Sequence, residues 1–221
     1  MNEEQRSLIA ELGKFSVCQL MDGLERSCPV ETGIGPIDPQ FRICGPAFTV
    51  ECAPGDNLTI HHALHLAQPG DVLVVATSPN CGAALWGELM SISAQSKGLA
   101  GTIIDGPARD PIEIRALGYP VFCRNINPCR ATKINYGRIN IPVSIGAIWI
   151  RPGDLVLADA NGIVSIPSGR ADQAVRLASE TVRKEDTIRG EILAGRSLFE
   201  IFNLEPYVST TAQRIAKTEI E

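Results

Sequence analysis

The stretch that decides the fold is GTIIDGPARDPIEIRAL, residues 101–117. It opens with a short apolar run that is typical of a buried strand, passes through a loop of small residues, and continues with apolar residues at helical spacing. Asp110, Pro111 and Glu113 form a helix-start signature, because Asp favours the N-cap, Pro the first helical position and Glu the third. The sequence therefore predicts a strand, a loop and a helix in this order.

The same alternation continues on both sides of this stretch. We expect strands at residues 71–76, 102–105 and 119–122, with helices at residues 85–97 and 111–117 between them. Three strands separated by helices imply parallel pairing through crossover connections. The other expected elements are helices at residues 3–13, from Ser16, from Asp56 or Asn57, and at 168–194, and strands at 47–52, 141–150, 155–158 and 162–166. The predicted fold class is α/β.

Composition limits the classes of function. With 221 residues and 44% hydrophobic content, we expect a single domain with a core at about 15–167 and a C-terminal helical extension at about 168–221. A net charge of -5 and 5% aromatic residues argue against a nucleic-acid partner. The sequence shows neither a signal peptide nor a membrane-length apolar run, so we expect a cytoplasmic protein without a membrane partner.

Cysteine and histidine spacing does not favour a structural metal or a disulfide framework. The seven cysteines are an odd number without a C-x-x-C pair, and most lie beside apolar residues, as small core residues do. His61 and His65 have the i, i+4 spacing that can hold zinc on a helix, but no Glu follows His61 and no third ligand is evident. Walker A, G-x-G-x-x-G and G-x-S-x-G motifs are also absent.

Arg109 and Asp110 are the first candidate site residues. By itself the segment is explained best by helix capping. However, both residues stand just beyond the carboxyl end of a predicted buried strand, which is where open α/β sheets bind ligands, and Gly106 and Ala108 leave room for a substrate. This position favours a functional interpretation.

The second candidate segment is Gly87-Glu88-Leu89-Met90, at or near the start of a helix. The unpaired N–H groups of a first helical turn favour an anion such as a carboxylate. An acidic residue that complements the helix dipole is the simpler explanation of Glu88. Together with Arg109, the segment could form a carboxylate clamp, and Glu88 and Asp110 could share a hard cation.

These residues resemble a known motif, an acidic residue followed after twenty positions by R-D-x-x-E/D, matched by Glu88, Arg109, Asp110 and Glu113. The chain resembles the RraA-like family, in its branch of class II 4-hydroxy-4-methyl-2-oxoglutarate / 4-carboxy-4-hydroxy-2-oxoadipate aldolases. Flanking segments such as Pro54-Gly-Asp-Asn57 agree. The resemblance implies a layered β-β-α swivelling fold of the phosphohistidine-domain kind, assembled as a homotrimer or homohexamer with active sites between subunits.

The resemblance also implies roles for individual residues. Asp110 would bind Mg2+ or Mn2+ directly, Glu88 would contact the cation through water, and Arg109 would bind the pyruvyl part of the substrate. The backbone of Gly87, Leu89 and Met90 would receive a carboxylate or keto group. Glu185 of a neighbouring subunit, with Asp186 close behind, would supply a further carboxylate through water. In the mechanism expected from this resemblance, Arg109, Glu88 and Glu185 are catalytic, and a metal-bound water poised by Glu88 or Glu185 is the base for the C4 hydroxyl group.

The predicted function is cleavage of a 4-hydroxy-2-oxo di- or tricarboxylic acid to pyruvate and a second oxo acid, with oxaloacetate decarboxylation as a second activity. The small-molecule partner is therefore an oxo acid. The alternative from another class is a regulator that binds ribonuclease E without catalysis. A methyltransferase acting on a menaquinone precursor is a third possibility attached to the family by name, but the sequence shows no Gly-rich cofactor loop to support it.

Overall fold

The computed structural model describes residues 3–24, 30–78 and 81–208. It divides into two compact units, Met1–Ala178 and Ser179–Glu221, with the division inside one long helix. The first unit contains the sheets and the candidate site. The second contains the remainder of the long helix and a short helix that follows it.

A mixed sheet forms the first unit. Its strands lie in the order β1-β11-β10-β3-β4-β5-β6-β2, β7 pairs with β3, and β8 and β9 form a separate hairpin. The strands are β1 (Val30–Glu31), β2 (Gly35–Pro36), β3 (Ile43–Glu51), β4 (Val72–Ala76), β5 (Gly101–Ala108), β6 (Val121–Ile126), β7 (Arg138–Ile139), β8 (Val143–Ile145), β9 (Ile148–Ile150), β10 (Leu155–Asp159) and β11 (Gly162–Ile166). Strands β3, β4, β5 and β6 pair in parallel, which confirms the predicted crossovers.

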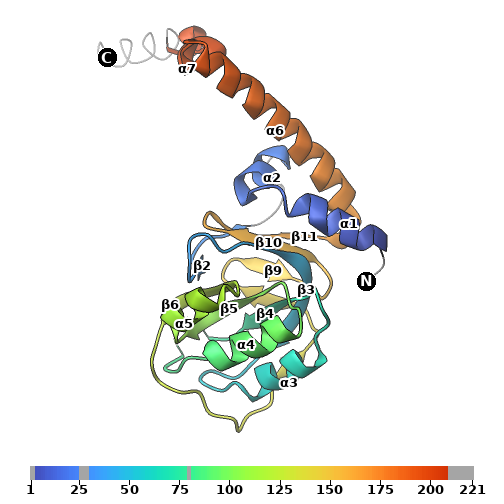
Figure 1. The fold of residues 1–221 in the computed structure, drawn as a ribbon, viewed down its shortest axis with the longest axis vertical. Coiled ribbons are helices and arrows are strands. Elements are labelled where there is room, and N and C mark those ends of the chain that lie inside the picture. Colours follow the sequence, from blue (N-terminus) through green and yellow to red (C-terminus); the bar gives the residue numbers. More distant parts are fainter. Residues whose placement is uncertain (1–2, 25–29, 79–80, 209–221) are drawn as a thin grey trace, which may run out of the picture. The chain divides into compact units, whose positions relative to one another are not determined.

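Helices α3, α4 and α5 lie on one face of the parallel strands (Figure 1). The helical elements are α1 (Glu3–Leu12), α2 (Val17–Gly23), α3 (Leu58–Leu66), α4 (Glu88–Ser96), α5 (Pro111–Leu117), the short 3-10 helix η1 (Ser168–Arg170), α6 (Ala171–Leu193) and α7 (Leu198–Ile201). None of the helices in the described ranges combines the length and apolar character that crossing a bilayer requires.

The local sequence explains where these elements begin and end. Every residue of β4 and β5 is buried, as expected for strands covered on both faces. The predicted capping box at Ser16 and Gln19 is present at the start of α2. Helix α5 has the predicted bounds, and it ends at Gly118, whose φ of 72° suits glycine.

Helix α4 begins later than the predicted start at residue 85. Leu85 and Trp86 are fully buried and extended beside the end of β5, and the helix begins only after Gly87. Hydrogen bonding to the neighbouring strand overrides the helical spacing of the apolar residues here. As a result, Glu88 is the first residue of the helix.

The cysteines follow the core prediction only in part. Cys52, Cys81 and Cys123 are buried, whereas Cys18 and Cys129 are exposed. Burial raises the pKa of Cys52 to about 12 and that of Cys123 to about 11, so these thiols stay protonated and unreactive. Cys28 lies outside the described residues.

The aspartates of the three Pro-Gly-Asp turns have different hydrogen-bond partners. Asp71 and Asp154 accept hydrogen bonds from Gln68 N and Arg151 N at 2.7 and 2.9 Å, so each tethers its own turn as predicted.

Asp56 instead holds a distant loop. Its Oδ1 accepts from Leu58 N at 3.0 Å, while its Oδ2 accepts from Thr132 Oγ1, Ile134 N and Asn135 N at 2.7, 2.7 and 3.0 Å. Burial alone would raise the pKa of Asp56, but these hydrogen bonds outweigh it and hold the pKa well below its ordinary 3.8.

Asp56→Asn should destabilise the first unit by about 1.5–3 kcal/mol at neutral pH, because an NH2 group would replace an oxygen that accepts three hydrogen bonds. A depressed folded-state pKa gives stability that is present above pH 3.8 and lost as the pH falls toward the folded-state pKa. The difference between wild type and variant in the free energy of unfolding should therefore shrink in acid. Denaturant titrations from pH 7 to 3 measure it, with Asp71→Asn as the matched control; a pH-independent difference would contradict the assignment.

Candidate active site

The site begins where the segment before α4 runs alongside the end of β5. Leu85 N donates to Pro107 O at 3.0 Å, and Arg109 N donates to Trp86 O at 2.9 Å. The two segments run parallel, with Trp86 paired to Ala108. The chain leaves through α4 and returns along β5, so residues twenty positions apart end side by side at the carboxyl end of the strand. This explains the spacing of the motif.

Asp110 connects the two segments. Its Oδ2 accepts a hydrogen bond from Glu88 N at 3.0 Å and lies 3.3 Å from Arg109 Nε. Although Asp110 occupies the N-cap of α5, its side chain makes no capping hydrogen bond to that helix. The capping explanation of this aspartate is therefore wrong, and its carboxylate is directed to the start of α4.

The backbone of Asp110 is in an uncommon conformation. Its φ and ψ are 57° and 47°, in the left-handed region that Asp tolerates better than most residues. Such conformations cost free energy and concentrate at functional sites, where the surrounding structure enforces them. Here the hydrogen bond between Asp110 and Glu88 keeps the carboxylate in place.

Gly87 is required by close packing. A Cβ at this position would lie 2.5 Å from Asp110 Oδ2 and 3.1 Å from Arg109 Nε. Its backbone is extended, with φ of -161°, so conformational freedom is not the reason for glycine. The absence of a side chain lets Asp110 and Arg109 approach the first turn of α4.

A cavity of about 120 Å³ opens beside these residues. Arg109, Arg130 and Lys133 line it, so its wall carries three positive side chains. Leu89 and Met90 also line it from the first turn of α4, where backbone N–H groups have no intrahelical acceptor. The cavity suits a small ligand with several negative or partly negative oxygens.

The lining residues that were not predicted from the sequence include four with amide, imidazole or cationic side chains: Asn57, His61, Arg130 and Lys133. Asn57 Nδ2 donates to Leu85 O at 3.1 Å, which ties the start of α3 to the segment before α4. Arg130 and Lys133 come from the loop that Asp56 holds. The segment Pro54-Gly-Asp-Asn57 of the sequence could have pointed to this side of the cavity, because its Asp56 holds the loop that carries Arg130 and Lys133.

Three further acidic residues do not line the cavity: Asp105, which precedes the motif on β5, and the motif and C-terminal residues Glu113 and Glu185. Asp105 is buried and ion-paired with Arg124, and its Oδ2 accepts from Gly146 N at 2.8 Å, so it stabilises the sheet. Glu113 is exposed on α5. Glu185 lies on α6 within the second unit, and its contribution to a neighbouring subunit's site stays a prediction.

The donors beside the cavity fit a hard divalent cation. Asp110 Oδ2 accepts the hydrogen bond from Glu88 N and lies near Arg109. Among the described residues, neither Asp110 Oδ1 nor the carboxylate of Glu88 has a hydrogen-bond partner. Mg2+ is commonly held by one or two carboxylates, with waters and substrate oxygens completing its octahedron. Within the described ranges, no group of three or more His, Cys, Asp or Glu side chains could hold a metal by themselves.

Comparison with known proteins gives consistent results. The family model described as Aldolase/RraA matches residues 17–165. A protein of Halalkalibacterium halodurans is 32% identical over 204 residues, covering 90% of this chain and 97% of that protein. Its name assigns it provisionally as a 4-hydroxy-4-methyl-2-oxoglutarate aldolase.

Two solved structures share the fold. An uncharacterised protein from Pseudomonas syringae is 29% identical with a TM-score of 0.79, covering 88% of this chain and 92% of that one. RraAS2 of Streptomyces coelicolor, described as an unusual member of the RNase ES inhibitor RraA protein family, is 28% identical with a TM-score of 0.75. That match covers 86% of this chain and 97% of the other. The predicted α/β fold of the RraA-like kind is confirmed.

Gly87→Ala should displace Asp110 or Arg109, because the added methyl group overlaps the carboxylate oxygen. We expect a destabilisation of about 1–3 kcal/mol, typical of overpacking. Gly82→Ala is the control, since a Cβ at that position meets no atom within 4 Å. Equal free energies of unfolding for the two variants would show that the close approach at Gly87 is not required.

Proposed function

The chain belongs to the Aldolase/RraA family, and from this premise we propose that it is a lyase of the aldolase type. Its substrate would be a 4-hydroxy-2-oxo di- or tricarboxylic acid, cleaved with the help of a divalent cation into pyruvate and a second oxo acid. Oxaloacetate decarboxylation would be a second activity. Both reactions break the C3–C4 bond and leave the pyruvate enolate, so one site can serve both.

The observation that carries this proposal is the direction of the Asp110 carboxylate. It contacts Glu88 N and Arg109, a residue that lines the cationic cavity, and makes no capping hydrogen bond to its own helix. A carboxylate with one open oxygen beside a guanidinium suits a site where a cation and a small anion meet. A purely structural role would not require this arrangement.

The residues divide the work according to their chemistry. Arg109 presents a planar fork that binds the 2-keto oxygen and the adjacent carboxylate of the substrate. The first-turn amides of Leu89 and Met90 add hydrogen bonds to the same end. Arg130 and Lys133 bind the carboxylate at the far end, and their positive charges stabilise the negative charge of the bound anion.

Asp110 would hold the cation directly, and Glu88 would contact it through water. When bound, Mg2+ or Mn2+ supplies Lewis-acid stabilisation of the enolate that forms at C2 and C3. The hydrogen bond from Glu88 N engages Asp110 Oδ2, which leaves Oδ1 available for this role.

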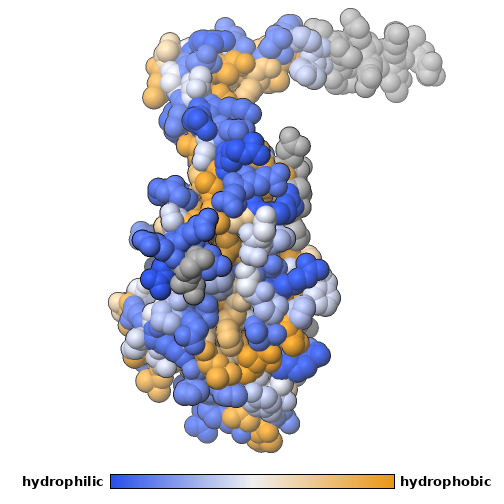
Figure 2. Space-filling view, turned by 90° about the vertical axis from the view of Figure 1, so that its right-hand side faces the viewer, coloured by the Kyte–Doolittle hydropathy of each residue, from blue (hydrophilic) through white to orange (hydrophobic). Residues whose placement is uncertain are grey.

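Assembly into a homotrimer or homohexamer, with Glu185 of a neighbouring subunit near the site, is part of the proposal. Figure 2 shows apolar side chains interspersed with polar ones on the surface it presents. In the first unit, Leu89, Ile112 and Ile134 expose 75%, 72% and 76% of their surface. Large apolar side chains exposed close to a site are common where a second subunit covers it.

A regulator of ribonuclease E is the second candidate, supported by the likeness to RraAS2. A protein-binding regulator does not require a cationic cavity or an open carboxylate. The three positive side chains around the cavity therefore favour the enzyme.

The direct test is the release of pyruvate from a panel of 4-hydroxy-2-oxo acids and from oxaloacetate, with Mg2+ and after its removal by chelation. We expect turnover of at least one hydroxy acid that is lost on chelation and restored by Mg2+ or Mn2+. If no oxo acid yields pyruvate while the chain binds ribonuclease E, the regulatory alternative is correct.

Asp110→Asn should lower kcat by about 10²-fold or more, because an amide is a poor ligand for a hard cation. The fold should persist, since Asn tolerates the left-handed backbone and still accepts the Glu88 N–H. Asp38→Asn is the control for loss of an acid, because within the described ranges the Asp38 carboxylate accepts a local hydrogen bond from Gln40 N and no other. Steady-state kinetics and Mg2+ titration measure the effect, and normal turnover of folded Asp110→Asn would remove Asp110 from the site.

A further inference from the structure

The wall of the cavity lacks an obvious proton acceptor. Among the described residues that line it, none is Asp or Glu, and the charged ones are Arg109, Arg130 and Lys133. Aldol cleavage nevertheless requires removal of the proton from the C4 hydroxyl group. His61 is the lining side chain whose chemistry meets this requirement.

Helix α3 fixes His61 at the cavity. Its N–H donates to Asn57 O at 3.1 Å, in the first turn of the helix. Asn57 in turn donates to Leu85 O, so the turn that carries His61 is tied to the segment that carries Gly87. The backbone of His61 therefore belongs to the same frame as the proposed substrate-binding amides, and its exposed imidazole lines the cavity from there.

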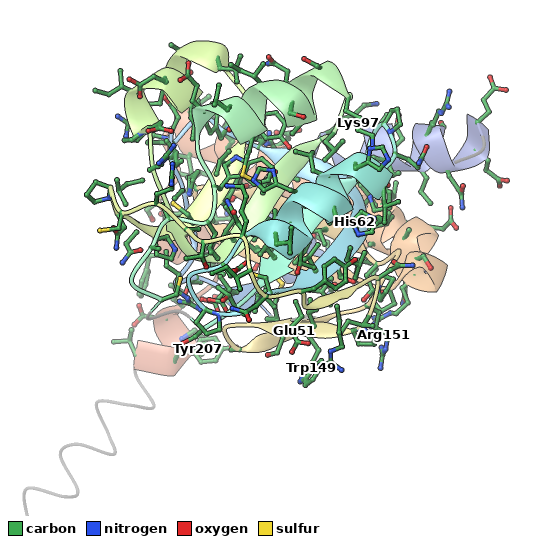
Figure 3. All side chains as sticks on the ribbon, turned by 90° about the horizontal axis from the view of Figure 1, so that it is seen from below. Glu51, His62, Lys97, Trp149, Arg151 and Tyr207 are labelled. Carbon is green, nitrogen blue, oxygen red and sulfur yellow. The ribbon has the colours of Figure 1, made fainter. Side chains whose placement is uncertain are left out.

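The surroundings favour the neutral form of His61. Partial burial lowers its pKa below the ordinary 6.5, and the positive charge of Lys133 lowers it further. On its other side, His61 shares the hollow between α3 and α4 with His65 and Lys97. Lys97 is fixed there, because its Nζ donates to Leu64 O at 2.9 Å (Figure 3).

The groups around His61 are therefore cationic or neutral. They are Arg109, Arg130 and Lys133 at the cavity and His65 and Lys97 in the hollow between the helices. Among the described residues, no Asp or Glu lines the cavity or this hollow, so no carboxylate is present there to stabilise a protonated imidazole. A neutral imidazole in this position can accept a proton at neutral pH.

We infer that His61 is the general base of the cleavage reaction and contacts the C4 hydroxyl group of the substrate. The inference rests on the proposed function and deepens it. It assigns proton transfer to a residue of helix α3 in the same chain, and it leaves Glu88 and Glu185 to the cation.

The step balances without a further reactant. The imidazole takes the hydroxyl proton, the C4–O bond becomes a carbonyl, and the C3–C4 bond breaks with its electron pair moving to C3 and C2 as the pyruvate enolate. The imidazolium then returns the proton to C3, which gives pyruvate and the second oxo acid. Oxaloacetate has no C4 hydroxyl group, so its decarboxylation leaves an enolate that takes a proton from water and needs no base.

This difference between substrates provides the test. His61→Gln should lower kcat for a 4-hydroxy-2-oxo acid by about 10²-fold or more, the usual contribution of a general base. Decarboxylation of oxaloacetate by the same Mg2+-loaded variant should change by less than about 10-fold, because no hydroxyl proton is removed in that reaction. His65→Gln is the matched control, because His65 lies one turn further along α3 and does not line the cavity.

Two further measurements separate a base from a structural residue. The wild-type kcat/KM for cleavage should fall in acid as His61 becomes protonated, with a midpoint below pH 6.5, and this acid limb should be absent in His61→Gln. Added imidazole should restore part of the cleavage rate of His61→Ala but not raise its decarboxylation rate.

The outcomes distinguish this inference from the proposed function. A wild-type chain that releases no pyruvate from any substrate contradicts the function itself. If the wild type cleaves hydroxy acids, equal loss of both reactions in His61→Gln, or activity equal to that of His65→Gln, overturns the role of His61. An acid limb that persists in His61→Gln and disappears in Glu88→Gln would assign the base to Glu88.

Discussion

The hydrogen bond from Glu88 N to Asp110 Oδ2 is the interaction on which the site depends. It joins the first turn of α4 to the loop after β5, and it exists because parallel pairing returns the chain to the same edge of the sheet. It requires an unfavourable left-handed backbone at Asp110 and a glycine at position 87. As a result, one carboxylate oxygen of Asp110 is fixed and the other has no hydrogen-bond partner among the described residues.

Electrostatics at the site run opposite to the charge of the whole chain. The net charge is -5, yet the cavity is lined by Arg109, Arg130 and Lys133. Two buried acids, Asp56 and Asp105, are saturated by hydrogen bonds or an ion pair away from the cavity, and Asp56 also anchors the loop that supplies two of the cations. Asp56 and Asp105 thus build the frame, while Arg109, Arg130 and Lys133 line the cavity.

Much of the fold could be predicted from the sequence, because the decisive signals are local. The bounds of α5 followed from its N-terminal Pro111 and its C-terminal Gly118, and parallel pairing followed from the alternation of strands and helices. The start of α4 could not be located in this way. Leu85 and Trp86 have helical spacing, but their backbone bonds to Pro107 and Arg109, which are distant in the sequence.

The site was predicted on one side only. Gly87, Glu88, Arg109 and Asp110 lie together as their motif suggested. The opposite wall, with His61 and Lys133, comes from a helix and a loop whose sequences carry no recognisable spacing relative to the motif. Long-range hydrogen bonds bring these segments to the cavity, among them those of Asp56 and Asn57 and the bond from Ala84 N to Cys129 O, and no local pattern encodes such contacts.

The central claim is that the open oxygen of Asp110 and the guanidinium of Arg109 form one binding site for a cation and an enolate-like anion. A crystal structure of the chain with Mg2+ and oxalate, which mimics the pyruvate enolate, tests it most directly. The account predicts the cation on Asp110 Oδ1, with Oδ2 still bound to Glu88 N, and oxalate in the cavity against Arg109 and the amides of Leu89 and Met90. A cation bound elsewhere, or an Asp110 carboxylate that has turned to cap α5, would contradict it.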